Sequence, residues 1–294
     1  MLEVVRRNAC GLVTAVLSMI MLVACSSPPT AGAPRPTAGT SEPTTSTVAP
    51  TSSSPSSSAP PPAPQWTVGA TPLPLRPDGF GKVLPTPAVL VNRKLPTADL
   101  LPPPVAGKYA ATVVPVPPDV LARSTWDPKC PVSLAELRYL TMSFWGFDGR
   151  PHTGEMIVNA RFADKVTTVF HALWDTKFPL ESMRVTSRAE LDAPPTGDGN
   201  TTAAFVCRPI VGQTSWSAHA YGLAIDVNPF CNPYTKGDLV LPELASSYVD
   251  RKSRRPGMVF PGDVTVKAFA AIGWSWGGDW TSPRDLQHFT ATGH

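Results

Sequence analysis

Charged residues are scarce in this 294-residue chain: they make up 16% of it, with 25 lysines and arginines against 22 aspartates and glutamates. No basic stripe is present, which disfavours nucleic-acid binding. Away from the N-terminus, no apolar run reaches the roughly 18–20 residues that a membrane-spanning helix needs. The five cysteines include no CxxC pair, which argues against a zinc cluster built from thiolates.

Proline, by contrast, is abundant and unevenly placed. Of the 36 prolines, 23 lie in residues 1–123, so regular helices or sheets are not expected to dominate that part. Residues 124–294 are long enough to bury one good hydrophobic core. We expect residues 65–123 to form extended segments or short edge strands that pack on this domain. The apolar stretches at 88–91 and 111–114 are candidates for such strands.

The N-terminus carries the features of an export signal. Arg6 and Arg7 precede an apolar stretch, Gly11 to Ala24, that is short for a membrane span. It ends in Leu22-Val23-Ala24-Cys25, which resembles the lipobox of bacterial lipoproteins. We therefore expect a signal peptide at 1–24 and lipidation of Cys25. The alternative is an ordinary cleaved signal with an incidental cysteine.

The segment behind Cys25 has the composition of a tether. Serine, threonine and proline occupy 28 of the 39 positions from 26 to 64. Such a stretch cannot bury enough apolar surface to offset its backbone entropy, and its prolines keep it extended. We expect residues 25–64 to be a disordered tether that holds the domain outside the cytoplasmic membrane, facing the cell wall.

Periodicity in residues 124–294 predicts a single α+β domain. A hairpin is expected from 137–147 and 155–159, with a further strand at 182–187. Helical spacing of apolar residues predicts helices at 162–178 and 264–272. Because strands and helices do not alternate regularly, we expect a small, mostly antiparallel sheet with flanking helices.

The first chemical cluster is Ser217 to Asp226. From Gly222 onward the residues alternate, with Leu223, Ile225 and Val227 expected in the core and Ala224, Asp226 and Asn228 on a cleft wall. Aspartate is disfavoured in the middle of a strand. A bound cation or a buried salt bridge would explain Asp226.

The second cluster lies near the C-terminus. Asp285 and His288 are three residues apart, which would place them on one face of a helical turn. Together, His219, Asp226 and His288 offer two imidazoles and one carboxylate, a zinc set that leaves a fourth position open for catalysis. Asp285 would then serve as general base. A lone histidine is more often structural, so spacing alone does not decide this.

These motifs resemble a known family. Ser217-x-His219-x-x-Gly222-x-Ala224-x-Asp226, followed by Trp276-Gly-Gly-Asp-Trp280 and Asp285-x-x-His288-Phe289, is similar to the zinc D-alanyl-D-alanine carboxypeptidases. That family includes vancomycin-resistance carboxypeptidases and L-alanyl-D-glutamate endopeptidases. The resemblance covers roughly residues 124–294, and the stretch 200–208 is similar to actinobacterial-type members.

The resemblance carries implications for fold and site. It implies the α+β fold shared with the Hedgehog signalling domain, and one Zn²⁺ bound by His219, Asp226 and His288. It also implies that Asp285 is the catalytic base, where family members often carry glutamate.

Substrate-binding residues are less determined. The family uses an arginine for the oxyanion or the substrate carboxylate, and Arg208 and Arg184 are both candidates because the familiar Ser-Gly-Tyr-Arg-Ser form is absent. Arg208 is the first choice, with a surface arginine as the alternative. Ser217 either binds substrate or orients His219. Tyr221 and Trp280 are candidates for the cleft wall.

The resemblance also bears on the cysteines. After export and lipidation, Cys130, Cys207 and Cys231 remain in an oxidising compartment. The pattern in family members implies a disulfide between Cys130 and Cys207, with Cys231 free. The rival pairing is Cys207 with Cys231.

The function expected from these features is hydrolysis of peptide bonds in peptidoglycan stem peptides. The sequence does not choose between a carboxypeptidase and an endopeptidase. A monomer is expected, with no nucleic-acid partner. The alternative is a non-catalytic, zinc-containing module that binds the cell wall or acts in signalling.

Lipid anchoring can be tested directly. Cys25→Ala should abolish metabolic lipid labelling, because the thiol is the acyl acceptor, and should either release the protein to the soluble fraction or leave an unprocessed precursor. Wild-type protein that is entirely soluble, with a mature N-terminus other than residue 25, would instead indicate an ordinary secreted protein.

Overall fold

The computed structural model describes residues 66–210 and 213–293, all within the unit bounded by Pro62 and His294. The expected signal peptide, Cys25 and the tether at 25–64 lie outside the described residues. No described helix is both long and apolar enough to cross a lipid bilayer.

The elements divide into short helices and mostly short strands. The α-helices are α1 (Ala88–Val91), α2 (Pro118–Arg123), α3 (Ala163–Asp175), α4 (Arg188–Leu191) and α5 (Val264–Ala271). The 3-10 helices are η1 (Val105–Gly107), η2 (Leu134–Glu136), η3 (Ala218–Tyr221), η4 (Ser246–Tyr248) and η5 (Gly277–Asp279). The strands are β1 (Ala111–Val114), β2 (Leu137–Gly146), β3 (Pro151–Asn159), β4 (Pro179–Leu180), β5 (Ser182–Met183), β6 (Thr201–Thr202), β7 (Ala224–Asp226), β8 (Tyr234–Lys236), β9 (Leu239–Leu241), β10 (Ser275–Trp276), β11 (Arg284–Asp285) and β12 (His288–Thr290).

A long antiparallel hairpin, β2–β3, forms the largest sheet. β1 pairs with the free edge of β2, and β4 pairs with the end of β2 in parallel. The stretch 111–114 is therefore the short edge strand that its sequence predicted. The stretch 88–91 is instead helix α1, because the Leu90 amide bonds to the Pro87 carbonyl and the Leu90 side chain is fully buried. Four apolar residues are too few for periodicity to separate the two forms.

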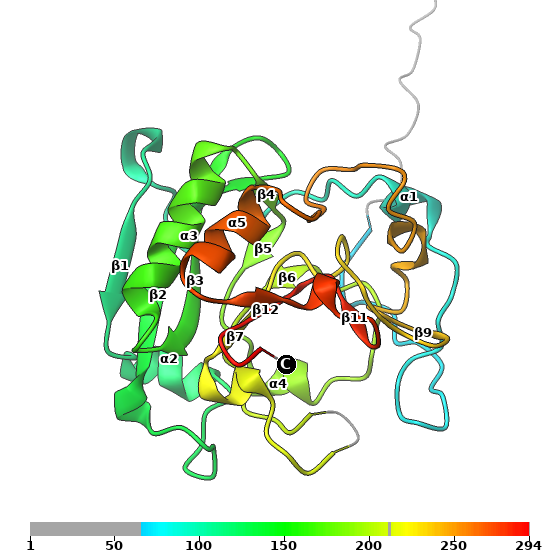
Figure 1. The fold of residues 1–294 in the computed structure, drawn as a ribbon, viewed down its shortest axis with the longest axis horizontal. Helices are drawn as coiled ribbons and strands as arrows, with labels where there is room; N and C mark the ends of the chain where they lie inside the picture. The colour runs from blue at the N-terminus through cyan, green and yellow to red at the C-terminus, as the bar shows by residue number, and fades with distance from the viewer. Residues whose placement is uncertain (1–65, 211–212, 294) are drawn as a thin grey trace, which may run out of the picture. The chain divides into compact units, whose positions relative to one another are not determined.

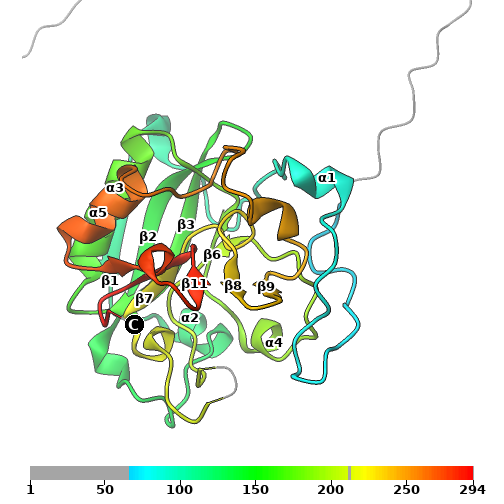
Figure 2. The same cartoon turned by 45° about the vertical axis from the view of Figure 1, so that its right-hand side comes forward.

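Helix α3 packs on β1 and β2 of this sheet, and α5 lies beside α3 (Figures 1 and 2). Both helices were predicted from apolar spacing, and the apolar face of α3 is buried as expected at Val166, Val169, Phe170 and Leu173. Asp263 starts α5 by accepting a hydrogen bond from the Val266 amide. The helices and the sheet enclose the main core, which reaches Ile225 and Phe289 beside the site.

The remaining sheets are small. They have the orders β10–β12–β7, β11–β8–β9 and β5–β6. The expected strand at 182–187 stops at Met183, because Ser187 instead forms a capping box with Glu190 at the start of α4. Mixed helices and small, mostly antiparallel sheets confirm the α+β class.

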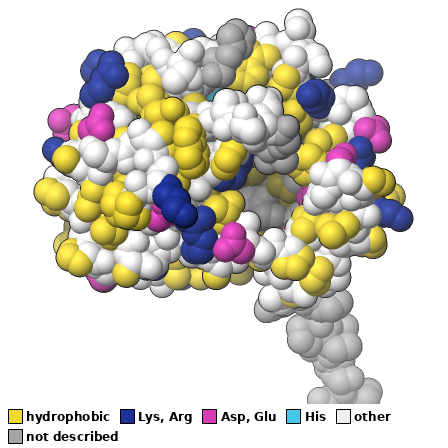
Figure 3. All heavy atoms as spheres, turned by 90° about the horizontal axis from the view of Figure 1, so that it is seen from below, with side chains coloured by type: hydrophobic (Ala, Val, Ile, Leu, Met, Phe, Trp, Pro, Cys, Tyr) yellow, Lys and Arg dark blue, Asp and Glu magenta, His cyan; other side chains and the backbone are white. Residues whose placement is uncertain are grey.

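Charge is dispersed on one face of the molecule. Figure 3 shows cationic and anionic side chains scattered among apolar ones over the face seen from below. This arrangement agrees with the low charge content of the sequence, and this face carries no broad area of one sign.

A buried ion pair ties the proline-rich N-terminal part to the domain. The Arg93 guanidinium donates to both carboxylate oxygens of Glu181, from Nε at 2.5 Å and from Nη2 at 2.6 Å. The Arg93 side chain is 0% exposed and that of Glu181 is 8% exposed. Asn200 also donates to Glu181, at 3.0 Å. Such bidentate, charge-assisted bonds fix geometry as well as charge.

Removing one partner of this pair should destabilise the fold strongly. Glu181→Ala leaves the Arg93 charge buried and uncompensated, a change that typically costs about 3–5 kcal/mol in the free energy of unfolding. Urea denaturation measures the loss. Arg150→Ala, which breaks the exposed pair with Asp148, is the matched control and should leave the midpoint nearly unchanged. Equal midpoints for the two variants would contradict the assignment.

Candidate metal centre and cleft

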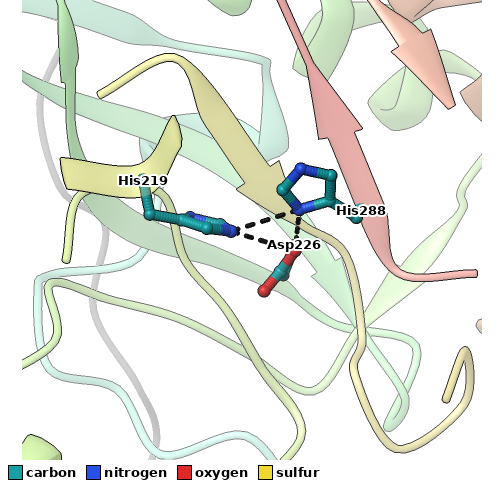
Figure 4. A group of neighbouring side chains, drawn as sticks. All are labelled: His219, Asp226 and His288. Carbon is teal, nitrogen blue, oxygen red and sulfur yellow. Dashed lines mark hydrogen bonds and ion pairs between the residues drawn. The ribbon is translucent and has the colours of Figure 1, made fainter. Parts of the chain in front are cut away.

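The centre of the site is one rung of a β-ladder. His288 in β12 lies directly opposite Asp226 in β7, although the two are 62 residues apart in sequence. Directly opposite residues in an antiparallel pair project to the same face with short separations. The ladder therefore brings the imidazole and the carboxylate together, and Figure 4 shows both side chains pointing to one point.

The second histidine comes from helix η3. Ser217 caps this helix, with its hydroxyl accepting a hydrogen bond from the His219 amide at 3.3 Å. Gly222 ends it in a left-handed conformation (φ 65°), and a Cβ there would meet the Asn159 amide nitrogen at 2.6 Å. Glycine is required on both counts.

Three donor atoms converge at this point. The Nε2 of His219 lies 3.2 Å from the Nδ1 of His288 and 3.3 Å from the Oδ1 of Asp226. His288 Nδ1 is 3.0 Å from that same oxygen. All three ligand atoms lie within 4.8 Å of one another, so the group could hold a metal ion.

The His219 ring is held in the form that a metal requires. Its Nδ1 lies 2.6 Å from the Ala204 carbonyl oxygen, which can only accept a hydrogen bond. In the neutral ring, Nδ1 therefore carries the proton, and the Nε2 lone pair points to where the donor atoms of Asp226 and His288 converge. A carbonyl bound to the far nitrogen is the usual way in which a histidine ligand is oriented.

The Asp226 carboxylate favours its charged form. Burial alone would raise its pKa, but when the neighbouring His219 and His288 rings are protonated, their charge and hydrogen bonds outweigh this and hold that pKa below its usual value. The side chain keeps 25% of its surface exposed, whereas that of His219 keeps 6%. The carboxylate is thus a negatively charged group that opens toward the cleft.

The pattern of alternation around Asp226 differs from expectation. Ala224 and Asn228 are buried, not on a cleft wall, and Leu223 is only partly buried. The strand β7 ends at Asp226, and Asn228 has a positive φ of 42°, so strict alternation does not continue that far. Asn228 instead donates to the Pro179 carbonyl at 2.8 Å.

Asp285 reaches the site from a different sheet. The expected helical turn shared with His288 is wrong: Asp285 lies in β11 opposite Tyr234, while His288 lies in β12. Strand pairing on both sides of the buried Leu286 decides the conformation. Burial and the nearby charge of Asp226 raise the pKa of Asp285 to about 7. Its Oδ1 is buried, with no hydrogen-bond partner within the described ranges.

A cavity of about 920 Å³ joins these groups. It is lined by His219, Asp226, His288 and Asp285. Of the predicted substrate-binding residues, Arg208, Ser217 and Trp280 also line it. The ring centroid of Trp280 is 5.5 Å from that of His288.

Two predicted substrate residues lie elsewhere. Arg184 follows β5 and forms an ion pair with Glu190, within the capping box of α4. Tyr221 packs against a separate apolar cluster that includes Leu137 and Phe205. Neither lines the cavity, so of the two arginines predicted from the sequence, Arg208 is the one beside the site. The Nη1 of Arg208 donates to the Pro209 carbonyl at 3.1 Å.

A disulfide braces the segment before Arg208. Cys130 and Cys207 are joined, 77 residues apart in sequence, while Cys231 is free and buried. This is the pairing that the family resemblance implied. The Cys207 amide also donates to Thr125 at 2.9 Å, so the chain that leads to Arg208 is fixed at two points.

Sequence reasoning missed several contributors. The Ala204 carbonyl that orients His219 has no side-chain signal. The cavity is also lined by the hairpin β8–β9 and by Arg76, Asp78 and Phe80, which come from a segment that sequence analysis assigned no chemistry. Only the tertiary fold places these residues beside the site.

Comparison with known proteins now bears on this arrangement. A family model described as D-alanyl-D-alanine carboxypeptidase matches residues 211–291. Over that stretch, the chain is similar to a peptidase family. The matched stretch is just over a quarter of the chain, and it contains His219, Asp226, Asp285 and His288 but not Arg208. No curated protein and no solved structure matches the chain.

Metal binding tests the geometry. Full chain incubated with Zn²⁺ and then desalted should retain one equivalent, because three converging donors suffice for a tetrahedral site with one open position. His219→Ala combined with His288→Ala should retain almost none, as measured by elemental analysis. The matched control is His171→Ala, since His171 lies on the exposed part of α3. Stoichiometric zinc in the double variant would overturn the site.

Proposed function

We propose that this chain is a zinc-dependent peptidase of the D-alanyl-D-alanine carboxypeptidase family that hydrolyses peptide bonds in peptidoglycan stem peptides. The observation that carries the proposal is the convergence of His219, Asp226 and His288 in one cavity with Asp285, whose buried Oδ1 has no hydrogen-bond partner among the described residues. The family match over residues 211–291 supports the same reading.

The residues present fit a catalytic zinc site. Two imidazoles and a carboxylate are typical zinc ligands, and three protein ligands leave one position open. The lone pair that His219 presents and the charge that Asp226 keeps are what a divalent cation needs. When bound, zinc supplies a polarised water whose pKa falls to about 7 and a Lewis acid for the carbonyl.

Asp285 is the residue placed to move protons. Its pKa of about 7 is near the range where a group can both accept and return a proton at neutral pH. As base it takes the proton of the attacking water at Oδ1, and it then donates that proton to the leaving amine. A carboxylate whose pKa is perturbed by burial and a neighbouring charge within a cleft is typical of a functional site.

Arg208 and Trp280 would position the substrate. Arg208 is the cationic side chain that we assign to the substrate carboxylate or to charge that develops on the scissile carbonyl oxygen. Trp280 would form an apolar wall next to His288. Ser217 acts through His219, whose amide it binds, so we assign it an orienting role.

The setting of this activity rests on the sequence. We propose that lipidated Cys25 and the tether hold a monomeric enzyme outside the cytoplasmic membrane, near wall peptides. The Cys130–Cys207 disulfide supports an oxidising compartment of this kind.

Mass analysis of purified peptidoglycan, digested with the zinc-loaded full chain, tests the proposal. Release of terminal D-alanine identifies a carboxypeptidase, and cuts within the stem or cross-link identify an endopeptidase. Unchanged peptidoglycan with retained zinc would instead favour the non-catalytic wall-binding or signalling module.

The base assignment has its own test. Asp285→Ala should retain zinc but lose about 10²–10⁴ in kcat, because general acid–base catalysis contributes that much. Asp279→Ala is the matched control: this carboxylate is exposed and lines the same cavity, and we assign it no role in proton transfer. Loss of zinc in the Asp285 variant would make this residue a ligand or structural group instead.

A further inference from the structure

The cleft contains a wall that lies outside the family match. Arg76, Asp78 and Phe80 line the same 920 Å³ cavity as His219, Asp226 and His288. These three belong to what we name the N-terminal segment, residues 66–84. This segment adds to the cavity a surface that residues 211–291 do not contain.

The N-terminal segment is held in place by specific bonds. The Leu73 amide donates to the Pro195 carbonyl at 2.8 Å, and Leu75 forms a β-bridge with Gly81. The Gly81 amide donates to the buried Glu243 carboxylate at 2.8 Å. A Cβ at Gly81 would meet an oxygen of that carboxylate at 2.8 Å, so a substitution there would displace it. These bonds flank the part that lines the cavity, whose position is therefore defined.

Arg76 links this segment to the hairpin β8–β9. Its two terminal nitrogens bind the two carboxylate oxygens of Asp238, at 3.0 and 3.2 Å, while its Nε binds Asp78 at 3.1 Å. Asp238 lies in the turn between β8 and β9. Such a fork-to-carboxylate pair is geometrically specific.

The hairpin in turn connects to the proposed base. β8 pairs with β9 on one edge and with β11 on the other, and Asp285 in β11 is opposite Tyr234 in β8. Arg76 therefore holds the β8–β9 turn of the three-stranded sheet whose edge strand β11 carries Asp285. Tyr234 and Lys236, both in β8, also line the cavity.

The size of the cavity indicates what it accepts. Clefts for drug-sized ligands hold about 300–1,000 Å³, and this cavity is near the upper limit. A free dipeptide is much smaller than such ligands and would fill only the part of the cavity beside His219, Asp226 and His288. A longer peptide can also contact the part of the lining that the N-terminal segment and the hairpin β8–β9 supply.

We propose that residues 76–80 and the hairpin β8–β9 form a distal subsite for an extended peptide, and that Arg76 is a positioning residue that holds this subsite through Asp238. Resting on the proposed function, this makes the substrate a peptide of several residues and not a free dipeptide. The part of the peptide remote from the cleaved bond binds in the distal subsite.

Kinetics with two peptides tests this proposal. The zinc-loaded full chain is assayed with free D-alanyl-D-alanine and with a stem pentapeptide that ends in the same two residues. Wild type should cleave the pentapeptide with at least about tenfold higher kcat/KM, since remote contacts contribute binding energy. Arg76→Ala should raise KM for the pentapeptide about two- to fivefold with kcat nearly unchanged, as for loss of an exposed charge pair that acts on binding.

Two further variants separate positioning from general stability. Exchanging the charges, Arg76→Asp with Asp238→Arg, should restore KM toward the wild-type value. Arg150→Ala is the matched control, because Arg150 pairs with Asp148 two residues away, as Arg76 does with Asp78, but does not line the cavity. Amide hydrogen exchange at residues 234–241 should become faster in Arg76→Ala and not in Arg150→Ala.

The outcomes are distinct. Equal kcat/KM for the two peptides, or an unchanged pentapeptide KM in Arg76→Ala, would overturn the distal subsite. If wild type cleaves neither peptide, the proposed function fails, and binding then decides the inference. In that case the pentapeptide, but not the dipeptide, should slow exchange of the hairpin amides, and the absence of this protection would overturn it.

Discussion

The register between β7 and β12 is the constraint on which the site depends. Because side chains alternate between faces, a slip of one residue would turn His288 toward the core and bring an apolar neighbour to the cleft. Phe289 prevents this, since its ring stacks on Phe269 with centroids 4.1 Å apart, deep in the core. Ile225 in β7 lies directly opposite Phe289 and is also buried in the core. Packing of two apolar side chains thus places His288 and Asp226 in the cleft.

The short connection between β11 and β12 sets the distance between Asp285 and the group of His219, Asp226 and His288. Only Leu286 and Gln287 separate β11 from β12, and both are fixed through their carbonyl oxygens. Trp276 donates its indole N–H to Leu286 at 2.9 Å, and the Val227 amide donates to Gln287 at 2.9 Å. These two hydrogen bonds fix the backbone of the connection, which leads from Asp285 in one sheet to His288 in another.

Much of the fold followed from patterns within single segments. The helices α3 and α5 and the hairpin β2–β3 are long enough for their apolar spacing to be read. Two-residue strands such as β5 and β11 have no periodicity, so long-range pairing decides them. That is why the spacing of Asp285 and His288, which suits a helical turn, was misleading.

The site followed from motifs, and its surroundings did not. His219, Asp226 and His288 stand in a recognisable order, whereas Arg184 could be separated from Arg208 only once its ion pair with Glu190 was visible. The orienting contact to His219 comes from a main-chain oxygen, which any residue could supply. The position of the N-terminal segment depends on partners more than a hundred residues away along the chain.

The side-chain amide of Asn200 connects the buried Arg93–Glu181 pair to the chain that follows β7. Its Nδ2 binds Glu181, and its Oδ1 accepts from the Phe230 amide at 3.0 Å, just beyond β7. Arg93, from the proline-rich region, is therefore connected through Glu181 and Asn200 to the loop that follows β7. Residues 124–294 are consequently not a transplantable module: grafted alone onto another scaffold, they would carry a desolvated carboxylate with its cation missing.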